Sequence, residues 1–369
     1  MYERCKAHNI PFRQTGKLVV AKRDQLPYIE GLHQKSQSLQ YSFPPQRNDE
    51  DAEKPALETT LLSGQEARAM EPDLSPEIMG ALWVPITGIV DSHSVMASLE
   101  KDILESDNGQ ISYATSVVRI DPYQRSKRPA NIIDFEPIES GWVIQAVTGD
   151  AEEADPILAK MVINASGLSS TLVLNSLLPQ DKRIPMFYAK GSYAKYAGPG
   201  VEHVKHLIYP CPETGPNAHA FQSLGTHLTL DLDGRIRFGP DIQWIPAPEE
   251  IPSDPREGAD FWTKHLIPDE SILPAMHAAV TSYLPRVTLD GLQPDYCGMR
   301  PKLVGPTGGF QDFVFRVDHP SIGGCLGGES SPMVSLLGIE SPGLTSSLGI
   351  AEKVVDDIIA QRTPEDEAA

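Results

Sequence analysis

The chain has 369 residues, long enough to bury a sizeable core, and we expect two interleaved domains. Its formal net charge of −19 argues against nucleic acid and against anionic membrane surfaces as general partners. A hydrophobic fraction of 40% together with 33 prolines indicates loop-rich insertions in a globular protein. No apolar run is long enough to be a transmembrane segment, and four scattered cysteines are typical of free thiols in a reducing compartment: Cys5, Cys211, Cys297 and Cys325.

The first sixty residues predict two helices and one strand. Residues 1–9 have the pattern of a helix end, 17–21 form a short β-type run after Gly16, and 24–38 predict a second helix. Residues 40–58 are acidic, contain proline and show no periodicity, so we interpret them as a mobile surface insertion.

Two capping signals mark the next helices. Ser63 and Glu66 have the spacing of a capping box, and residues 81–84 predict a strand. Asp91 is placed to cap a helix. Its apolar positions recur on one face of that helix: Val95, Met96, Leu99 and Ile103.

The middle of the chain changes to β patterns. Residues 110–120 and 142–148 predict strands separated by a polar insertion. The apolar run over 157–165 predicts a buried parallel strand whose small residues at the end allow close backbone approach, and Ser169 then caps a helix.

An Asp233–Gly234 turn between two alternating runs predicts a β-hairpin. Period-two alternation puts His227, Thr229 and Asp231 on one face and Leu228, Leu230 and Leu232 on the other. The leucine face must pack on a core, whereas the polar face meets either solvent or a cavity. Helices over 258–266 and 271–283 and a strand over 312–317 follow.

Near the C-terminus an apolar strand runs into Gly338, and a Ser341–Pro342–Gly343 turn precedes a helix that we expect to begin at Thr345 or Ser346. The first N–H groups of a helix have no intrahelical partner and its dipole is positive there, so such a turn can bind an anion. A reduced flavin needs such a site beside its pyrimidine ring, and an ordinary strand-to-helix connection is the alternative interpretation.

Four ordered stretches carry a family resemblance, although none of them is very specific alone. They contain Arg13 and Gly16, Gly88 and Asp91, the hairpin from Gly225 to Asp241, and the turn from Gly338 to Thr345. Together they resemble the D-amino-acid-oxidase-like (DAO) family of FAD-dependent oxidoreductases, and most closely its L-2-hydroxyglutarate dehydrogenase branch.

The resemblance implies an α/β fold: a Rossmann-like FAD-binding domain with an inserted, mainly antiparallel β substrate domain. We expect the cofactor domain over 1–180 and 296–369 and the substrate domain over 181–295, with further substrate-domain strands drawn from 10–90. The family's opening Gly-x-Gly-x-x-Gly turn is not found in this chain, because Gly198 and Gly200 are not followed by a third glycine and a helix. We therefore expect a domain that lacks its first βαβ unit, from a late start or a shortened form, and that binds FAD weakly or not at all on its own.

The resemblance also implies roles for particular residues. His227 is the implied base and Arg300 the carboxylate ligand, with Thr229, Lys302 and His93 on the substrate side. The implied FAD contacts are Val117 at the adenine, Ala165, Ser166 and Gly167 near the pyrophosphate, and Gly338, Pro342, Gly343, Leu344 and Thr345 at the flavin. Core packing, a helix cap and a surface arginine are the alternatives from the residues alone. We assign no metal, because His203 and His206 would point to opposite faces of a strand.

The implied activity is FAD-dependent oxidation of a 2-hydroxy acid, most closely L-2-hydroxyglutarate to 2-oxoglutarate, with hydride transfer to flavin N5. The partner is then a small 2-hydroxy (di)carboxylate, and the electron acceptor stays open. The alternatives are an amine-oxidising sibling acting on sarcosine or glycine, and a flavin-free protein without catalysis. The resemblance implies a mitochondrial location, with the cytoplasm as the alternative.

Overall fold

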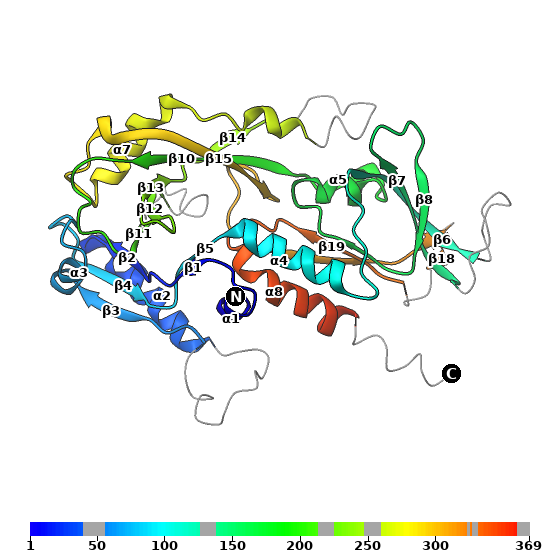
Figure 1. The fold of residues 1–369 in the computed structure, drawn as a ribbon, viewed down its shortest axis with the longest axis horizontal. Coiled ribbons are helices and arrows are strands. Elements are labelled where there is room, and N and C mark those ends of the chain that lie inside the picture. Colours follow the sequence, from blue (N-terminus) through cyan, green and yellow to red (C-terminus); the bar gives the residue numbers. More distant parts are fainter. Residues whose placement is uncertain are drawn as a thin grey trace, which may run out of the picture.

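The computed structural model describes residues 1–39, 56–125, 138–212, 225–246, 260–322, 325–326 and 331–359. Figure 1 shows an elongated molecule in which the long strands β10 and β15 run along one side. The short strands β2, β3 and β4 lie at one end, and the strands β6, β7 and β8 lie at the other. The predicted α/β fold class is confirmed, and the predicted insertion over 40–58 lies almost entirely outside the described residues.

A nine-stranded sheet forms the larger part of the fold. Its order is β14-β10-β13-β12-β11-β2-β4-β3, with β15 paired to β10, and β11 with β2 is the parallel pair. The strands are β2 (Lys17–Ala21), β3 (Thr60–Ser63), β4 (Gly80–Val84), β10 (Phe187–Tyr196), β11 (Leu207–Pro210), β12 (His227–Leu230), β13 (Ile236–Gly239), β14 (Gln243–Ile245) and β15 (Leu292–Lys302). Strands from 17–84 thus share a sheet with the hairpin, and the boundary expected at 295 falls inside β15.

One face of this sheet is buried against helices. Leu18, Ile208, Leu228 and Phe238 are fully buried, and they belong to one cluster with Met276 and Val280 of α7 (Leu273–Thr281) and Ala67 of α3 (Gly64–Met70). The hairpin alternation predicted this face correctly for Leu228 and Leu230. Leu232 was predicted on the same face but is 38% exposed, because β12 ends at Leu230 before the turn.

The second part of the fold contains two three-stranded sheets. The first joins β9 (Val162–Asn164) in parallel to β19 (Met333–Leu337), with β16 (Val314–Asp318) antiparallel on the other side of β19. The second is an antiparallel meander of β6 (Thr115–Gln124), β7 (Ser140–Thr148) and β8 (Asp155–Ala159). Two further short pairs join β1 (Phe12–Arg13) to β5 (Ile89–Val90) and β17 (Ser321–Ile322) to β18 (Cys325–Leu326).

The prediction of one parallel strand over 157–165 was wrong. The chain bends at Lys160, so β8 pairs antiparallel with β7 and only β9 pairs in parallel with β19. An apolar run alone does not distinguish one buried strand from two short strands in different sheets.

The helices agree with their capping signals better than with their apolar stripes. Ser63 and Glu66 form the predicted capping box, and the Asp91 side chain accepts hydrogen bonds from the backbone of His93 and Ser94. The described α-helices are α1 (Tyr2–Ala7), α2 (Leu26–Ser38), α3, α4 (Ser92–Glu105), α5 (Ser170–Asn175), α7 and α8 (Gly343–Glu352). On α4 only Val95 of the four predicted apolar positions is buried. Met96, for example, is 61% exposed.

Shorter turns complete the description. The helix expected over 258–266 is the 3-10 segment Phe261–His265, and α8 continues into a π-helical segment, Lys353–Ile359. The remaining 3-10 turns are Arg23–Gln25, Gly167–Ser169, Gln180–Lys182, Glu270–Ile272 and Leu289–Gly291. In the part of the chain that is described, the helices are too short or too polar to cross a membrane.

The leucine face of the hairpin gives a matched test of this packing. Leu228→Ala should lower the free energy of unfolding by about 2–5 kcal/mol, because the residue is fully buried and leaves a cavity. Leu232→Ala should cost less than about 1 kcal/mol, because that side chain is already partly in water. Urea unfolding at pH 7 measures both, and equal losses would contradict the assignment of the two leucines.

Candidate functional site

The polar face of the hairpin is covered at His227. The residue is 8% exposed, and its ring stacks on Tyr209 of the neighbouring strand β11 with 3.9 Å between the centroids and 19° between the planes. Lys17 of β2 places its Nζ 4.9 Å from the centroid of the same tyrosine ring. The solvent interpretation of this face therefore does not hold at His227, whose ring is buried against its neighbours.

Burial keeps the His227 imidazole neutral. Desolvation lowers the pKa of His227 to about 3; the hydrogen bond to Gly225 opposes this shift, and the positive charges of Arg300 and Lys17 add to it. The Nδ1 atom lies 3.2 Å from the Gly225 carbonyl oxygen. Because a carbonyl can only accept, Nδ1 carries the hydrogen and Nε2 keeps its lone pair. The stacked ring of Tyr209 is also removed from water, and this burial raises the pKa of Tyr209 to about 12.

Arg300 lies on the same side of the sheet. It is paired with Ala189 of β10, and its charge acts on both His227 and Tyr209. Burial raises the pKa of Tyr193, and a hydrogen bond with Arg300 partly offsets that shift. The structure therefore brings together the two residues predicted as base and carboxylate ligand, although they are far apart in sequence.

Glu340 joins the end of β15 to the turn before α8. Its Oε1 atom lies 2.7 Å from Lys302 Nζ, and its Oε2 atom lies 3.6 Å from Arg300 Nη1. The Lys302 side chain is 9% exposed and that of Glu340 17%, so this pair is largely out of water. Lys302, Glu340 and Gly338 also line a hollow of about 320 Å³ that is partly open to solvent.

Glu340 was missed by the sequence analysis. Its only signal was a single carboxylate between a glycine and the Ser341–Pro342 turn, and nothing in the spacing indicated two basic partners. We now include Glu340 with Arg300 and Lys302 as the ion-pair cluster of the site.

The turn after β19 leads into α8 two or three residues earlier than expected. Gly338 has φ +66°, a conformation that favours glycine, and α8 begins at Gly343 instead of Thr345 or Ser346. The Gly343 N–H donates to the Glu340 carbonyl, and the Ser346 N–H donates to that of Pro342. The N–H groups of Leu344 and Thr345 have no hydrogen-bond partner among the described residues. They form the exposed N-terminal end of a ten-residue helix, where an anion is favoured.

Ala165, Ser166 and Gly167 lie beside that turn. Because β9 and β19 run in parallel, their carboxyl ends meet at one edge of the sheet. The Asn164 amide donates to the Ser170 carbonyl at 2.8 Å, and its oxygen accepts from the Ser166 hydroxyl at 2.6 Å. These bonds hold the segment, and the side chains of Ala165 and Ser166 remain exposed at the edge where ligands of parallel sheets bind.

The remaining predicted residues lie apart from these contacts. Thr229 is half-buried and pairs with Arg237 on the His227 face of the hairpin. The His93 side chain is fully exposed at the start of α4, where its backbone N–H donates a hydrogen bond to the capping carboxylate of Asp91. Val117 is 46% exposed on the meander, next to a register shift between it and Arg119. The described contacts do not bring His93 or Val117 to the ion-pair cluster.

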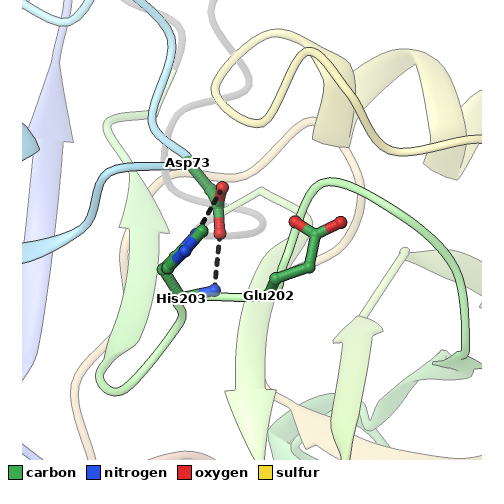
Figure 2. A group of neighbouring side chains, drawn as sticks. All are labelled: Asp73, Glu202 and His203. Atoms are coloured by element: carbon green, nitrogen blue, oxygen red, sulfur yellow. Dashed lines mark hydrogen bonds and ion pairs between the residues drawn. The ribbon is translucent and has the colours of Figure 1, made fainter.

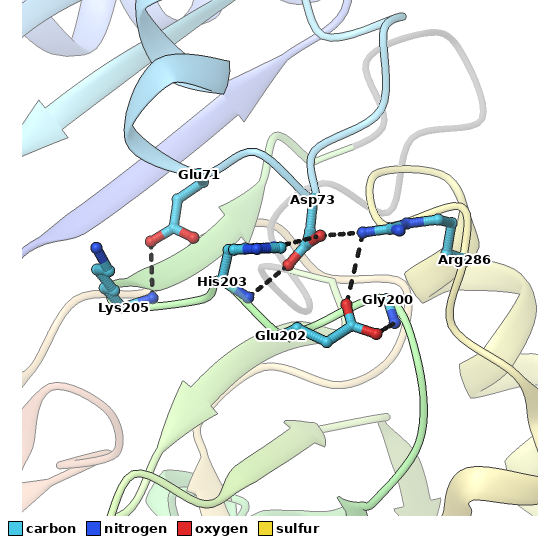
Figure 3. Close-up of polar contacts among 7 residues, drawn as sticks. All are labelled: Glu71, Asp73, Gly200, Glu202, His203, Lys205 and Arg286. Atoms are coloured by element: carbon cyan, nitrogen blue, oxygen red, sulfur yellow. Dashed lines mark hydrogen bonds and ion pairs between the residues drawn. The ribbon is translucent and has the colours of Figure 1, made fainter.

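A second polar cluster joins the loop after α3 to the loop before β11. Asp73, Glu202 and His203 place their ligand atoms within 4.8 Å of one another (Figure 2). Asp73 is fully buried and accepts hydrogen bonds from His203 N, at 2.8 Å, and from Arg286 (Figure 3). Burial alone would raise the pKa of Asp73, but these hydrogen bonds outweigh it and lower the pKa. The Arg286 guanidinium supplies the positive charge that a metal ion would bring, so we interpret this cluster as a structural clamp.

Comparison with known proteins identifies the family. The family model "FAD dependent oxidoreductase" (DAO) matches residues 1–356. The chain belongs to this family of FAD-dependent oxidoreductases. It is 30% identical to L-2-hydroxyglutarate dehydrogenase, mitochondrial, of Arabidopsis thaliana, over 97% of this chain and 69% of that protein. It is 24% identical to L-2-hydroxyglutarate dehydrogenase of Escherichia coli K12, over 96% of this chain and 75% of that protein.

Solved structures show the same fold at low identity. The L-α-glycerophosphate oxidase of Mycoplasma pneumoniae with FAD bound has a TM-score of 0.61 at 18% identity, covering 94% of this chain and 73% of that chain. The L-proline dehydrogenase of P. horikoshii has a TM-score of 0.62 at 16% identity, covering 98% and 77%. FAD is the cofactor of this family, and the α/β fold of this oxidoreductase is shared with both.

The described residues fit the flavin end of FAD. The unpaired N–H groups of Leu344 and Thr345 suit a ring that gains negative charge on reduction. The small exposed residues after β9 leave room at the sheet edge. A Gly-x-Gly-x-x-Gly turn for the pyrophosphate is not found in the 369 residues, so the fit concerns the flavin end alone.

The neutral state of His227 predicts a measurable pH dependence of stability. Its pKa is about 3 when folded and 6.5 as the reference value, so between these the unfolded chain binds a proton that the folded chain does not. Stability contributed by the neutral imidazole is therefore lost as the pH falls below 6.5. Between pH 7 and pH 5 the oxidoreductase should lose about 2 kcal/mol more than its His227→Gln variant. Urea unfolding at both pH values measures this difference, and parallel losses would show that the imidazole is solvated.

Proposed function

We propose that the protein oxidises a 2-hydroxy dicarboxylate, L-2-hydroxyglutarate, to the 2-oxo acid. The observation that carries the proposal is a neutral, buried imidazole on the same face as Arg300 and the ion-pair cluster. A hydroxy acid needs a base for its hydroxyl proton and a cation for its carboxylate, and these two groups supply them. The names of the plant, bacterial and human relatives support the choice of substrate.

In this proposal each residue has one task. His227 Nε2 takes the proton of the substrate hydroxyl, because its lone pair is free while Nδ1 donates to Gly225. Arg300 holds the carboxylate next to the reacting carbon through two parallel N–H bonds. Bound FAD would supply the acceptor for the hydride from that carbon. The N–H groups at the start of α8 would hold the flavin end of the cofactor, where the dipole of the helix favours negative charge.

The low pKa of His227 is consistent with a base that works only with substrate bound. An imidazole with a pKa of about 3 is a weak base in the empty site. A bound dianion offsets the charges of Arg300 and Lys17, which are among the causes of the low value. Binding therefore removes the part of the shift that these two charges cause, while burial, the largest cause of the low pKa, stays.

The location is proposed from relatives alone. Those of Arabidopsis thaliana and Homo sapiens carry the word mitochondrial in their names, and we propose the same compartment here. The Escherichia coli relatives keep the cytoplasm as the alternative.

Substrate choice can be tested directly. With FAD bound, the enzyme should reduce a dye faster with L-2-hydroxyglutarate than with glycine or sarcosine, because a neutral hydroxyl and two carboxylates match a neutral base and several cations. The measurement is kcat/KM for each of the three substrates. Faster turnover of either amine would assign the protein to the amine-oxidising alternative.

Two substitutions should separate the roles of base and ligand. His227→Ala should lower kcat by about 10²- to 10⁴-fold with a smaller effect on KM, as expected for loss of a general base. Arg300→Lys should mainly raise KM, because lysine keeps the charge and loses the two-point contact. Steady-state kinetics on FAD-loaded protein measure both, with His265→Ala as the control for a histidine elsewhere. Near-normal turnover of His227→Ala with FAD still bound would refute the role of this face.

A further inference from the structure

Lys17 lies in one row with the proposed base. The sheet order places β12, β11 and β2 side by side, and these strands carry His227, Tyr209 and Lys17. Tyr209 stacks on His227 from one side and lies under the Lys17 ammonium on the other. The row spans two strand spacings, about 10 Å. Lys17 was not among the residues that the sequence analysis selected.

No described residue supplies a counterion to the Lys17 ammonium. Among the described residues it forms no ion pair or hydrogen bond, and its one polar contact is with the face of the Tyr209 ring. Burial lowers the pKa of Lys17, which shows that the ammonium is not fully compensated by water. By contrast, Lys302 has a direct carboxylate partner in Glu340. An unpaired cation beside a catalytic face is costly unless a ligand brings the missing negative charge.

The charges on the two sides of His227 match a dianion. Arg300 and Lys302 share the single carboxylate of Glu340, which leaves one net positive charge there. Lys17 adds a second positive charge from another strand, and both Lys17 and Arg300 act on the pKa of His227. A substrate with two carboxylates and a hydroxyl between them can therefore contact a cation at each end and the imidazole in the middle.

We propose that Lys17 binds the distal carboxylate of the substrate and makes the site selective for dicarboxylates over monocarboxylates. The inference rests on the proposed function, in which Arg300 holds the carboxylate next to the reacting carbon. It adds a specificity residue on β2, a strand far from β15 in sequence and in the sheet order.

The test is isothermal titration of the FAD-loaded protein with 2-oxoglutarate and with 2-oxopentanoate. The two ligands share a five-carbon chain and a 2-oxo acid group, and only the first has a distal carboxylate. Lys17→Met should raise the Kd for 2-oxoglutarate by about 30-fold or more, the range for losing a desolvated charge contact. Its Kd for 2-oxopentanoate should change by less than about twofold, because the proximal contacts remain.

Two further variants complete the design. Lys17→Arg should recover most of the preference for 2-oxoglutarate, because it restores the positive charge. Lys195→Met is the matched control, an exposed lysine on β10 of the same sheet, and should leave both Kd values unchanged. The fitted stoichiometry in each titration reports the fraction of folded, competent protein.

Each outcome has one meaning. A selective loss for 2-oxoglutarate in Lys17→Met, with recovery in Lys17→Arg, supports the inference. Equal losses for both ligands would overturn it and assign Lys17 to support of the Tyr209 ring, and no loss for either would overturn it and leave Lys17 without a role in binding. In both cases a wild-type preference for 2-oxoglutarate keeps the proposed function. If the wild-type protein shows no preference for 2-oxoglutarate, the dicarboxylate substrate fails and the role of Lys17 fails with it.

Discussion

The ion pair between Lys302 and Glu340 links two sheets that share no strand pairing among the described residues. Lys302 ends β15 in the nine-stranded sheet, and Glu340 follows β19 in the sheet that carries the turn before α8. Without the carboxylate, the neighbouring Arg300 and Lys302 would repel each other in a region with little water. The same contact therefore links the face of one sheet that we propose binds the substrate to the edge of the other that we propose binds the flavin.

This constraint explains why the site is electrostatically unbalanced. One carboxylate serves two cations, Lys17 has no described anion, and His227 is held neutral by burial. Each of these features costs folding free energy, because charged or titratable groups are removed from water without full compensation. Such costs are expected at functional sites, because a substrate of opposite charge supplies the missing compensating charge when it binds.

Local patterns predicted the parts of the site that depend on neighbours in sequence. The alternation of the hairpin placed Leu228 in the core and His227 on the opposite face, and the glycine turn after β19 was placed correctly apart from the helix start. Those features follow from the period-two geometry of strands and from the residue preferences of turns, and both can be recognised directly in a sequence. The strand over 157–165 failed because which strands pair is decided by contacts that a short apolar run does not encode.

The missed residues share one physical reason. The role of Glu340 depends on its contact with Lys302, 38 positions earlier in the sequence. The proposed role of Lys17 depends on Tyr209 and His227, about two hundred positions later. A single lysine at the start of an apolar strand gives no functional signal in the sequence. Only the sheet order places it beside a stacked tyrosine and a buried imidazole.

The cluster of Asp73, Glu202 and His203 shows the opposite case. Its residue types fit a metal ion, yet the Arg286 guanidinium already lies on the buried carboxylate and completes its charge. At Asp73 the chain supplies its own counterion, and at Lys17 the described residues supply none. A buried charge with an internal partner therefore indicates a structural role, whereas a partly buried charge without a described partner, on the same face as the proposed base, is where we propose that a ligand binds.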